Sequence, residues 1–250
     1  MKQLCTCGGR KIFGEVFLPD GEGKVPLIIF SHELGQCHFT TEGYARVLNE
    51  AGFACIIFDF CGGTEPNLPN ESDPNPDMSV ISERDEIMAI VEAARGYDRI
   101  DPEKIILCGA SQGGMASALA AAELGDAIIG VALMYPALCI SEDMHNTFGS
   151  LDNVGERFDL WGGFMNLSKR YVSDVWDLDV YEKLAKIKKP VLLMHGDIDD
   201  LVNISYSLRA ADVLENCEFH TIENAGHGFA EESFVTASGY IKDFALRLIR

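Results

Sequence analysis

The feature that most constrains the fold is the alternation of short apolar runs with segments of helical periodicity. The runs 25–32 (VPLIIFSH), 53–60 (FACIIFDF) and 104–110 (KIILCGA) have the length and apolar content of buried strands, and 79–96 has apolar residues at helical spacing. Short apolar strands separated by helices predict an α/β fold with a mostly parallel, twisted sheet covered by helices on both faces. Further strands are expected at 11–19, 127–136, 190–197 and 217–223, and further helices at 41–51, from 111, at 204–215 and at 231–250.

Length and one irregular segment define the expected domain organisation. With 250 residues, of which 47% are hydrophobic, the chain is long enough for one large α/β domain, so 1–250 is expected to be a single domain. Between about 136 and 179, aromatic and methionine residues are mixed with glycines and charges, and no clear strand is visible. An insertion of this length at the active edge of a sheet is usually functional, and we expect a lid. Its candidate substrate contacts, which could equally serve only to pack the lid onto the body, are Trp161, Phe164, Met165 and Trp176.

Composition excludes several classes of function. Lys and Arg together number 20 against 39 Asp and Glu, and a formal net charge of −19 disfavours nucleic acid and anionic membrane surfaces as partners. The sequence has neither an apolar run of the roughly 18 residues that a membrane span needs nor the apolar core of a signal peptide, so a cytoplasmic location is expected. The eight cysteines are then reduced thiols. Because the histidines and cysteines lack metal-ligand spacing, we expect no metal and no cofactor.

A serine stands among very small residues in the stretch ILCGASQGGMAS. Gly109, Ser111 and Gly113 form the pattern G-x-S-x-G after an expected strand and before an expected helix. In that context the pattern is typical of a nucleophile on a sharp strand-to-helix turn, whose strained backbone tolerates almost no side chain nearby. Ala110, Gly113 and Gly114 meet this requirement. The alternative is a glycine-rich turn with an incidental serine.

A nucleophilic serine needs a base and a carboxylate that orients the base, and both types of residue follow in the sequence. A serine hydroxyl is a weak nucleophile until a neighbouring histidine can remove its proton. The stretch HGDIDDLV follows an expected strand and offers Asp197, Asp199 and Asp200, and GHGF places His227 between two glycines after the next strand. The sequence therefore contains candidates for all three members of a catalytic triad.

The order of serine, acid and histidine resembles that of the α/β-hydrolases, and the resemblance extends over nearly the whole chain. In that family the pattern H-G-x-x-D-x-x-V carries the triad acid, which maps to Asp199, while GHGF matches the triad histidine, His227. Asp197 and Asp200 are the competitors for the acid; the first is expected to brace the turn and the second to face solvent. His195 is expected to be a structural residue of the same turn.

The resemblance also implies an oxyanion hole formed by two backbone amides. One amide belongs to the residue after the nucleophile, Gln112. The other comes from the loop after the strand at 25–32, where the family usually has His-Gly followed by the donor. This chain has SHELGQ, so that Glu33 replaces the glycine and Leu34 takes the donor position, with Glu33 as the alternative donor. His32 is expected to brace the loop.

Within the family, the chain resembles small bacterial carboxylesterases of the cinnamoyl (feruloyl) esterase type in length and in the position of the lid. The resemblance implies hydrolysis of small-molecule acyl or aryl esters, with hydroxycinnamoyl esters among the candidates, through an acyl-enzyme intermediate. An aromatic residue able to bind a phenolic hydroxyl often follows GGF in those enzymes; Met165 stands there in this chain, which weakens the case for aromatic acids. A serine peptidase or acyl-peptide hydrolase, and a non-catalytic binding protein with the same fold, are the alternatives. The oligomeric state stays open, a homodimer included.

Overall fold

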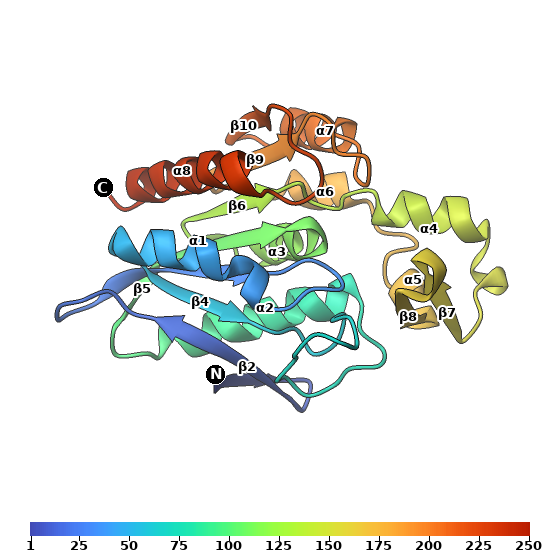
Figure 1. Cartoon of the computed structure of the whole chain (residues 1–250), viewed down its shortest axis with the longest axis horizontal. Helices are drawn as coiled ribbons and strands as arrows, with labels where there is room; N and C mark the ends of the chain where they lie inside the picture. Colours follow the sequence, from blue (N-terminus) through green and yellow to red (C-terminus); the bar gives the residue numbers. More distant parts are fainter.

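A computed structural model describes all residues, 1–250, and places most of the strands in one sheet (Figure 1). The sheet has eight strands in the order β1-β2-β4-β3-β5-β6-β9-β10. Its centre is parallel, and β1 and β2 join one edge in antiparallel pairing. The strands are β1 (Lys2–Cys7), β2 (Arg10–Phe17), β3 (Val25–Ser31), β4 (Ala54–Phe58), β5 (Ile100–Ala110), β6 (Gly130–Met134), β9 (Val191–Gly196) and β10 (Cys217–Ile222).

Helices cover both faces of the sheet. The faces have separate apolar cores, to which α2, α3 and α7 contribute on one side and α1 and α8 on the other. Both faces are buried because side chains alternate along each central strand, and those strands are apolar over most of their length. The helices that pack on the sheet are α1 (Phe39–Glu50), α2 (Val80–Arg95), α3 (Ser111–Leu124), α7 (Ser205–Val213) and α8 (Glu231–Leu248).

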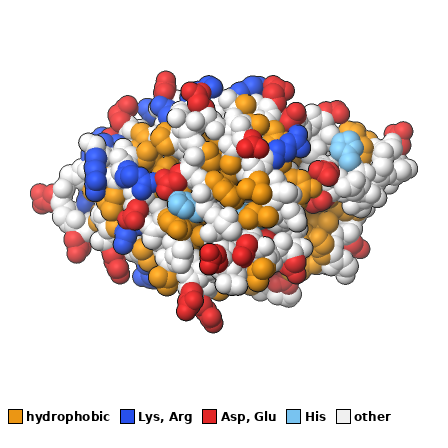
Figure 2. Space-filling model, turned by 90° about the horizontal axis from the view of Figure 1, so that it is seen from above, with side chains coloured by type: hydrophobic (Ala, Val, Ile, Leu, Met, Phe, Trp, Pro, Cys, Tyr) orange, Lys and Arg blue, Asp and Glu red, His pale blue; other side chains and the backbone are white.

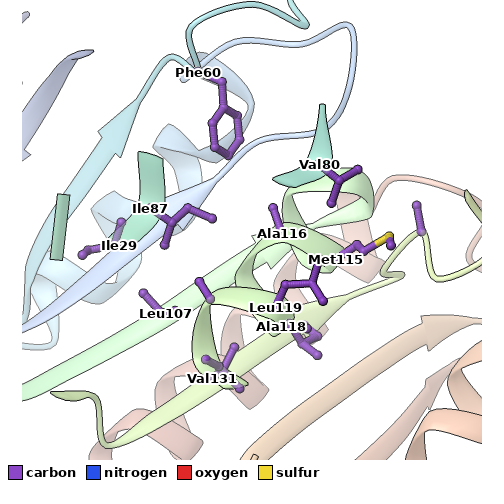
Figure 3. Close-up of a cluster of buried hydrophobic side chains, with 14 of the residues drawn as sticks. Ile29, Phe60, Val80, Ile87, Leu107, Met115, Ala116, Ala118, Leu119 and Val131 are labelled. Carbon is purple, nitrogen blue, oxygen red and sulfur yellow. The ribbon is translucent and has the colours of Figure 1, made fainter. Parts of the chain in front are cut away.

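Helix α3 lies at the centre of the larger core. Figure 3 shows Ile29, Leu107 and Val131 of three neighbouring strands on the side of the sheet where α2 and α3 pack. Every residue of α3 from Ser111 to Ala121 is buried. Small side chains dominate this stretch, in which the helix packs against both the sheet and the neighbouring helix α2. The alanine-rich sequence thus brings the start of α3 close to the sheet.

The segment between β6 and β9 projects from the end of the sheet toward which the parallel strands point (Figure 1). It contains an antiparallel hairpin in a segment where no strand was expected. That expectation was wrong because the first hairpin strand, RFDL, alternates exposed and half-buried residues and has no apolar run. The elements of the segment are α4 (Ile140–Phe148), β7 (Arg157–Leu160), β8 (Met165–Ser168), α5 (Lys169–Ser173) and α6 (Val180–Leu184).

Strand β1 was also missed, since the first strand was expected at 11–19. Its six residues are mostly exposed or half-buried, as suits an edge strand that shows one face to solvent. On the molecular face that Figure 2 shows, hydrophobic side chains gather toward the middle, and acidic and basic side chains are interspersed around them. None of the helices combines the length with the apolar composition that a membrane crossing requires.

A buried carboxyl group in α2 makes stability depend on pH. Glu86 is 4% exposed and accepts a hydrogen bond from the Cys61 amide at 2.9 Å, and burial raises its pKa from 4.5 to about 7. Because the folded state holds this proton more tightly than the unfolded state, the stabilisation is complete below pH 4.5 and is lost as the pH rises toward 7. Glu86→Gln keeps an acceptor for the amide and removes the titration.

Between pH 4.5 and pH 7, we therefore expect the free energy of unfolding of the native protein to fall by up to about 3 kcal/mol relative to that of Glu86→Gln. Urea unfolding at a series of pH values measures this difference. Glu92→Gln, an exposed position on the same helix, is the control and should follow the native profile. Parallel profiles for Glu86→Gln and the native protein would contradict the assignment.

Candidate active site

The nucleophile candidate lies on a strained turn between β5 and α3. Ala110 has extended backbone angles (φ −114°, ψ 139°), and Ser111 then has a positive φ of 51°. A positive φ in a residue other than glycine costs on the order of 1–3 kcal/mol and is maintained only where the surroundings impose it. The turn places Ser111 at the carboxyl end of β5, where its side chain borders two cavities.

The glycines of G-x-S-x-G are required because backbone approaches them closely. A Cβ atom on Gly113 would lie 2.3 Å from the carbonyl oxygen of His32 and 2.6 Å from that of Ser31. A Cβ atom on Gly109 would lie 2.3 Å from the carbonyl oxygen of Gly113. The start of α3 therefore packs directly on the end of β3, and through it on the loop that follows β3.

Gly113→Ala should destabilise the fold because backbone atoms on both sides must move to admit the methyl group. Overpacking of this kind costs about 1–3 kcal/mol, and here it also displaces the loop after β3. Thermal unfolding and ester turnover measure the two effects. Gly239→Ala in α8 is a matched control: nothing lies within 4 Å of its added Cβ, so alanine should hold or slightly raise stability there. Equal stability for the two variants would contradict the close approach at Gly113.

Three side chains from separate loops form a hydrogen-bonded chain. The Ser111 hydroxyl lies 2.9 Å from His227 Nε2, and His227 Nδ1 lies 2.8 Å from Asp199 Oδ2. The other carboxylate oxygen of Asp199 accepts hydrogen bonds from the amides of Leu201 and Val202, at 3.0 and 2.8 Å. These bonds fix the carboxylate, which in turn orients the imidazole with Nε2 toward the serine.

The two other aspartates of HGDIDDLV do not reach the histidine. Asp197 and Asp200 are both exposed, and neither bonds to His227. His195, and not Asp197, braces this turn. The His195 side chain is buried. Its Nε2 donates to the Val202 carbonyl at 2.8 Å, and its Nδ1 accepts from the Ser207 hydroxyl at 2.7 Å. Asp197 fails in this role because its side chain points to solvent. Burial lowers the pKa of His195, so it stays neutral beneath the turn.

The loop after β3 presents free backbone amides next to the serine. Neither the amide of Leu34 nor that of Glu33 makes a hydrogen bond within the protein, while the Glu33 carbonyl accepts from His32 Nδ1 at 2.8 Å and from the Gln36 amide at 3.1 Å. His32 Nε2 accepts from the Phe60 amide at 3.2 Å, and burial lowers the pKa of this imidazole. Leu34 lines the same cavity as Ser111 and Gln112.

The side chain of Gln112 is held by two buried partners that the sequence analysis did not identify. Its amide nitrogen donates to Glu83 Oε1 at 2.9 Å, and its oxygen accepts from the Tyr171 hydroxyl at 2.6 Å. Desolvation raises the pKa of Glu83 well above its usual range. The available signal was a carboxyl group at position 83, on the apolar face of the helical pattern. Tyr171 offered no comparable signal because it comes from the insertion.

Two cavities meet at the serine. One, of about 420 Å³, extends under the insertion and is lined by Gln112 and Tyr171; the other, of about 690 Å³, is lined by His227 and the residues after it. Both are bordered by Leu34 and Ser111. Ser111 therefore borders both volumes, which adjoin along these shared residues.

The four candidate contacts of the insertion separate into two pairs. Trp161 borders both cavities, and Phe164 lines the larger one, with its ring where a Cβ on Gly35 would come within 2.4 Å. Met165 is buried in the core and Trp176 packs on His145, with ring centroids 3.8 Å apart, and neither residue lines either of the two cavities at the serine. The expectation that Met165 and Trp176 contact the substrate is therefore corrected, because both side chains pack against other residues of the protein.

A buried group of potential metal ligands includes residues that directly follow the loop after β3. Cys37, His38 and Asp59 bring ligand atoms within 4.8 Å of one another, although the sequence spacing gave no sign of it. The Asp59 carboxylate already accepts from the His38 amide and ring, at 2.9 and 2.8 Å, and from the Glu71 amide at 3.1 Å. These bonds fasten the start of α1 to the end of β4, which is a structural role.

Comparison with known proteins identifies the same architecture. Est1E from Butyrivibrio proteoclasticus, solved with ferulic acid bound, is 27% identical, with a TM-score of 0.88 over 100% of this chain and 99% of that chain. An esterase from Exiguobacterium antarcticum shares the fold at 16% identity, with a TM-score of 0.72 over 98% of this chain and 100% of that chain. These similarities confirm the predicted α/β-hydrolase fold.

Two sequence matches complete the comparison. The quorum-quenching protein AidA of Acinetobacter baumannii is 27% identical over 100 residues, which are 40% of this chain and 32% of that protein, so the match spans about a third of the relative's length. Residues 39–248 match the prolyl oligopeptidase family. The matched region contains the serine, the acid and the histidine described above. The chain thus belongs to the prolyl oligopeptidase family and is a hydrolase of the α/β-hydrolase type.

Proposed function

We propose that this protein is a serine esterase that cleaves small acyl or aryl esters. The observation that carries the proposal is the chain of hydrogen bonds from Ser111 through His227 to Asp199, at 2.9 and 2.8 Å, beside the free amide of Leu34. A base within hydrogen-bond reach of a strained, cavity-facing serine, itself oriented by a carboxylate, is the arrangement that nucleophilic acyl transfer requires.

The mechanism follows from these positions. His227 removes the proton from Ser111 as its oxygen attacks the ester carbonyl, and the amides of Leu34 and Gln112 stabilise the negative charge that develops on the carbonyl oxygen. His227 then protonates the departing alcohol and later activates the water that releases the acid. Asp199 holds the imidazole tautomer and stabilises its protonated form. None of these steps needs a cofactor.

The insertion acts in this proposal as a lid over the acyl-binding cavity. Its elements contribute Ile140, Met144 and Leu160 to the apolar lining of the 420 Å³ cavity, together with the polar side chains of Asp143 and Asn146. A mostly apolar pocket with a few polar groups suits a short acyl chain or an aromatic acid. Hydroxycinnamoyl esters are among the proposed substrates, since the similar Est1E was solved with ferulic acid bound.

Hydrolysis of peptide or acyl-peptide bonds is the second candidate function. The match to the prolyl oligopeptidase family favours it, because the same triad chemistry can release an amine as well as an alcohol. The two candidates differ in the leaving group, so one set of substrates separates them.

A substrate panel tests the proposed function. We expect turnover of p-nitrophenyl esters from acetate to octanoate and of methyl ferulate, slower or no turnover of aminoacyl p-nitroanilides, and labelling of Ser111 by a fluorophosphonate. The chain-length profile measures the acyl cavity. Faster cleavage of the anilides would establish the peptidase. A folded protein that neither cleaves any of these compounds nor reacts with the fluorophosphonate would be a non-catalytic binding protein.

A further inference from the structure

The backbone amide of Gln112, proposed above as an oxyanion donor, has no hydrogen bond of its own to keep it in place. Gln112 is the second residue of α3, and the first N–H groups of a helix find no acceptor within the helix. The side chain of Gln112, in contrast, is 1% exposed and is hydrogen-bonded at both ends of its amide group. These two side-chain bonds anchor the residue that carries the donor.

One anchor is Glu83 of α2. Its Oε1 accepts a hydrogen bond from Gln112 Nε2 at 2.9 Å, while its Oε2 is buried without a partner. Burial raises the pKa of Glu83 well above its usual range, so the carboxyl group is neutral. A neutral carboxyl group accepts the hydrogen bond without placing a negative charge near the point where an oxyanion forms, and such a charge would oppose the oxyanion.

Glu83 also lies against the segment that supports the other proposed donor, the amide of Leu34. A Cβ atom on Gly63 would come within 3.2 Å of Glu83 Oε1 and within 3.5 Å of the Leu34 side chain. The carbonyl oxygen of Gly63 accepts a hydrogen bond from the amide of Gly35 at 2.6 Å, and Gly35 directly follows Leu34. The carboxyl group of Glu83 is therefore close to the supports of both donors.

The other anchor is Tyr171 of α5, which belongs to the insertion. Its side chain is 2% exposed, and its hydroxyl donates to Gln112 Oε1 at 2.6 Å. Burial raises the pKa of Tyr171, which keeps this hydroxyl protonated and able to donate. Tyr171 also borders the 420 Å³ cavity, but its proton is already engaged by Gln112. The hydroxyl thus serves a contact within the protein.

Helix α5 is fastened to the start of α2. The hydroxyl of Ser79, the N-cap residue of α2, donates to Asp174 Oδ2 at the end of α5, at 2.6 Å. Glu83 lies one turn further along α2. The bond between Ser79 and Asp174 therefore holds the helix that carries Tyr171 against the helix that carries Glu83, and Gln112 is clamped between the two.

We infer that Glu83 and Tyr171 are positioning residues that hold the Gln112 amide where the oxyanion forms. Each acts through the Gln112 side chain rather than on the substrate. The insertion then contributes to transition-state stabilisation through α5, in addition to lining the acyl cavity. This inference rests on the proposed esterase function and adds to it the residues that place one oxyanion donor. Because such a donor acts only when it is correctly placed, its displacement slows the chemical step and leaves ester binding unchanged.

The experiment measures kcat and KM of Tyr171→Phe and Glu83→Met on p-nitrophenyl acetate, butyrate and octanoate. The first variant removes one hydroxyl and keeps the ring, and the second removes the acceptor and keeps the length of the side chain. We expect kcat to fall by about tenfold or more on every ester, with KM within about twofold of the native value. The affinity for an alkylboronic acid, whose tetrahedral adduct with Ser111 places an oxygen in the oxyanion hole, should fall by a similar factor.

Three further variants complete the design. Glu83→Gln restores a neutral acceptor for Gln112 and should recover most of the kcat that Glu83→Met loses. Tyr181→Phe removes a hydroxyl from α6 of the same insertion, at a position that lines neither cavity at the serine, and should keep native kinetics. In Gln112→Met the side chain makes neither bond, so kcat should fall there too, and addition of Tyr171→Phe should lower it no further.

An increase of KM with acyl chain length in Tyr171→Phe, with kcat unchanged, would overturn the inference, since it would make Tyr171 only a wall of the acyl cavity. A full additional fall of kcat when Tyr171→Phe is added to Gln112→Met would overturn it as well, and so would equal losses in Glu83→Gln and Glu83→Met. Thermal unfolding shows which variants are folded, and if Glu83→Met is not, the Tyr171→Phe series decides. Failure of the native protein to hydrolyse any ester would instead reject the proposed function itself.

Discussion

Ser111→Ala should lower kcat on p-nitrophenyl acetate by roughly 10⁶-fold and abolish labelling by a fluorophosphonate, without unfolding the protein. Loss of a triad serine removes the covalent pathway, so only binding and oxyanion stabilisation still contribute to the rate. The side-chain oxygen bonds only to His227, and alanine meets the same backbone conformation as serine. The midpoint of thermal unfolding should therefore stay close to the native value.

Ser117→Ala is the matched control for this variant. Ser117 lies on the same helix and is fully buried, and its hydroxyl has no hydrogen-bond partner. Removal of that hydroxyl should leave both turnover and stability near the native values. Retained turnover in Ser111→Ala, with a native level in Ser117→Ala, would show that the hydrolysis uses another nucleophile.

Asp199→Asn should lower kcat/KM on the order of 10⁴-fold. The amides of Leu201 and Val202 donate to Oδ1 of the native carboxylate, so the oxygen of an asparagine would take that position and its NH₂ group would face His227. His227 would then accept at Nδ1 and carry its proton on Nε2. In that tautomer it cannot remove the proton from Ser111.

The neighbouring aspartates provide the comparison for Asp199. Asp197→Asn and Asp200→Asn change exposed side chains that do not contact the histidine, and both variants should keep nearly native kcat/KM. A damaging Asp197→Asn beside a harmless Asp199→Asn would contradict the assignment of the acid. The kinetics of all three variants on one ester decide between these outcomes.

The parts of the fold that could be predicted are those whose sequence is apolar for a local reason. Central strands such as β3 and β5 are buried on both faces, and their apolar runs predict this burial directly. The hairpin of β7 and β8 could not be recognised because its strands are only four residues long and β7 has no buried residue. Its pairing depends on contacts within the insertion rather than on a periodic pattern.

The candidate site shows the same division. Ser111 stands out because close backbone approach demands glycines around it, which is a local requirement. Tyr171 reaches the site only through packing between elements distant in the sequence, and nothing in its neighbouring residues signals it. Met165 illustrates the reverse case. Its position in the sequence predicted a contact with the substrate, but in the structure its side chain is buried in the core.

The cavity volume on the side of His227 also bears on what ends the catalytic cycle. In the proposed mechanism the alcohol departs beside His227, which lines the cavity of about 690 Å³, while the acyl group is still bound to Ser111. A single water takes up about 30 Å³, so the vacated space admits an incoming alcohol as readily as solvent. Partition of the acyl-enzyme between water and such an acceptor then depends on their relative concentrations, and at high alcohol concentration the site would favour transesterification over hydrolysis.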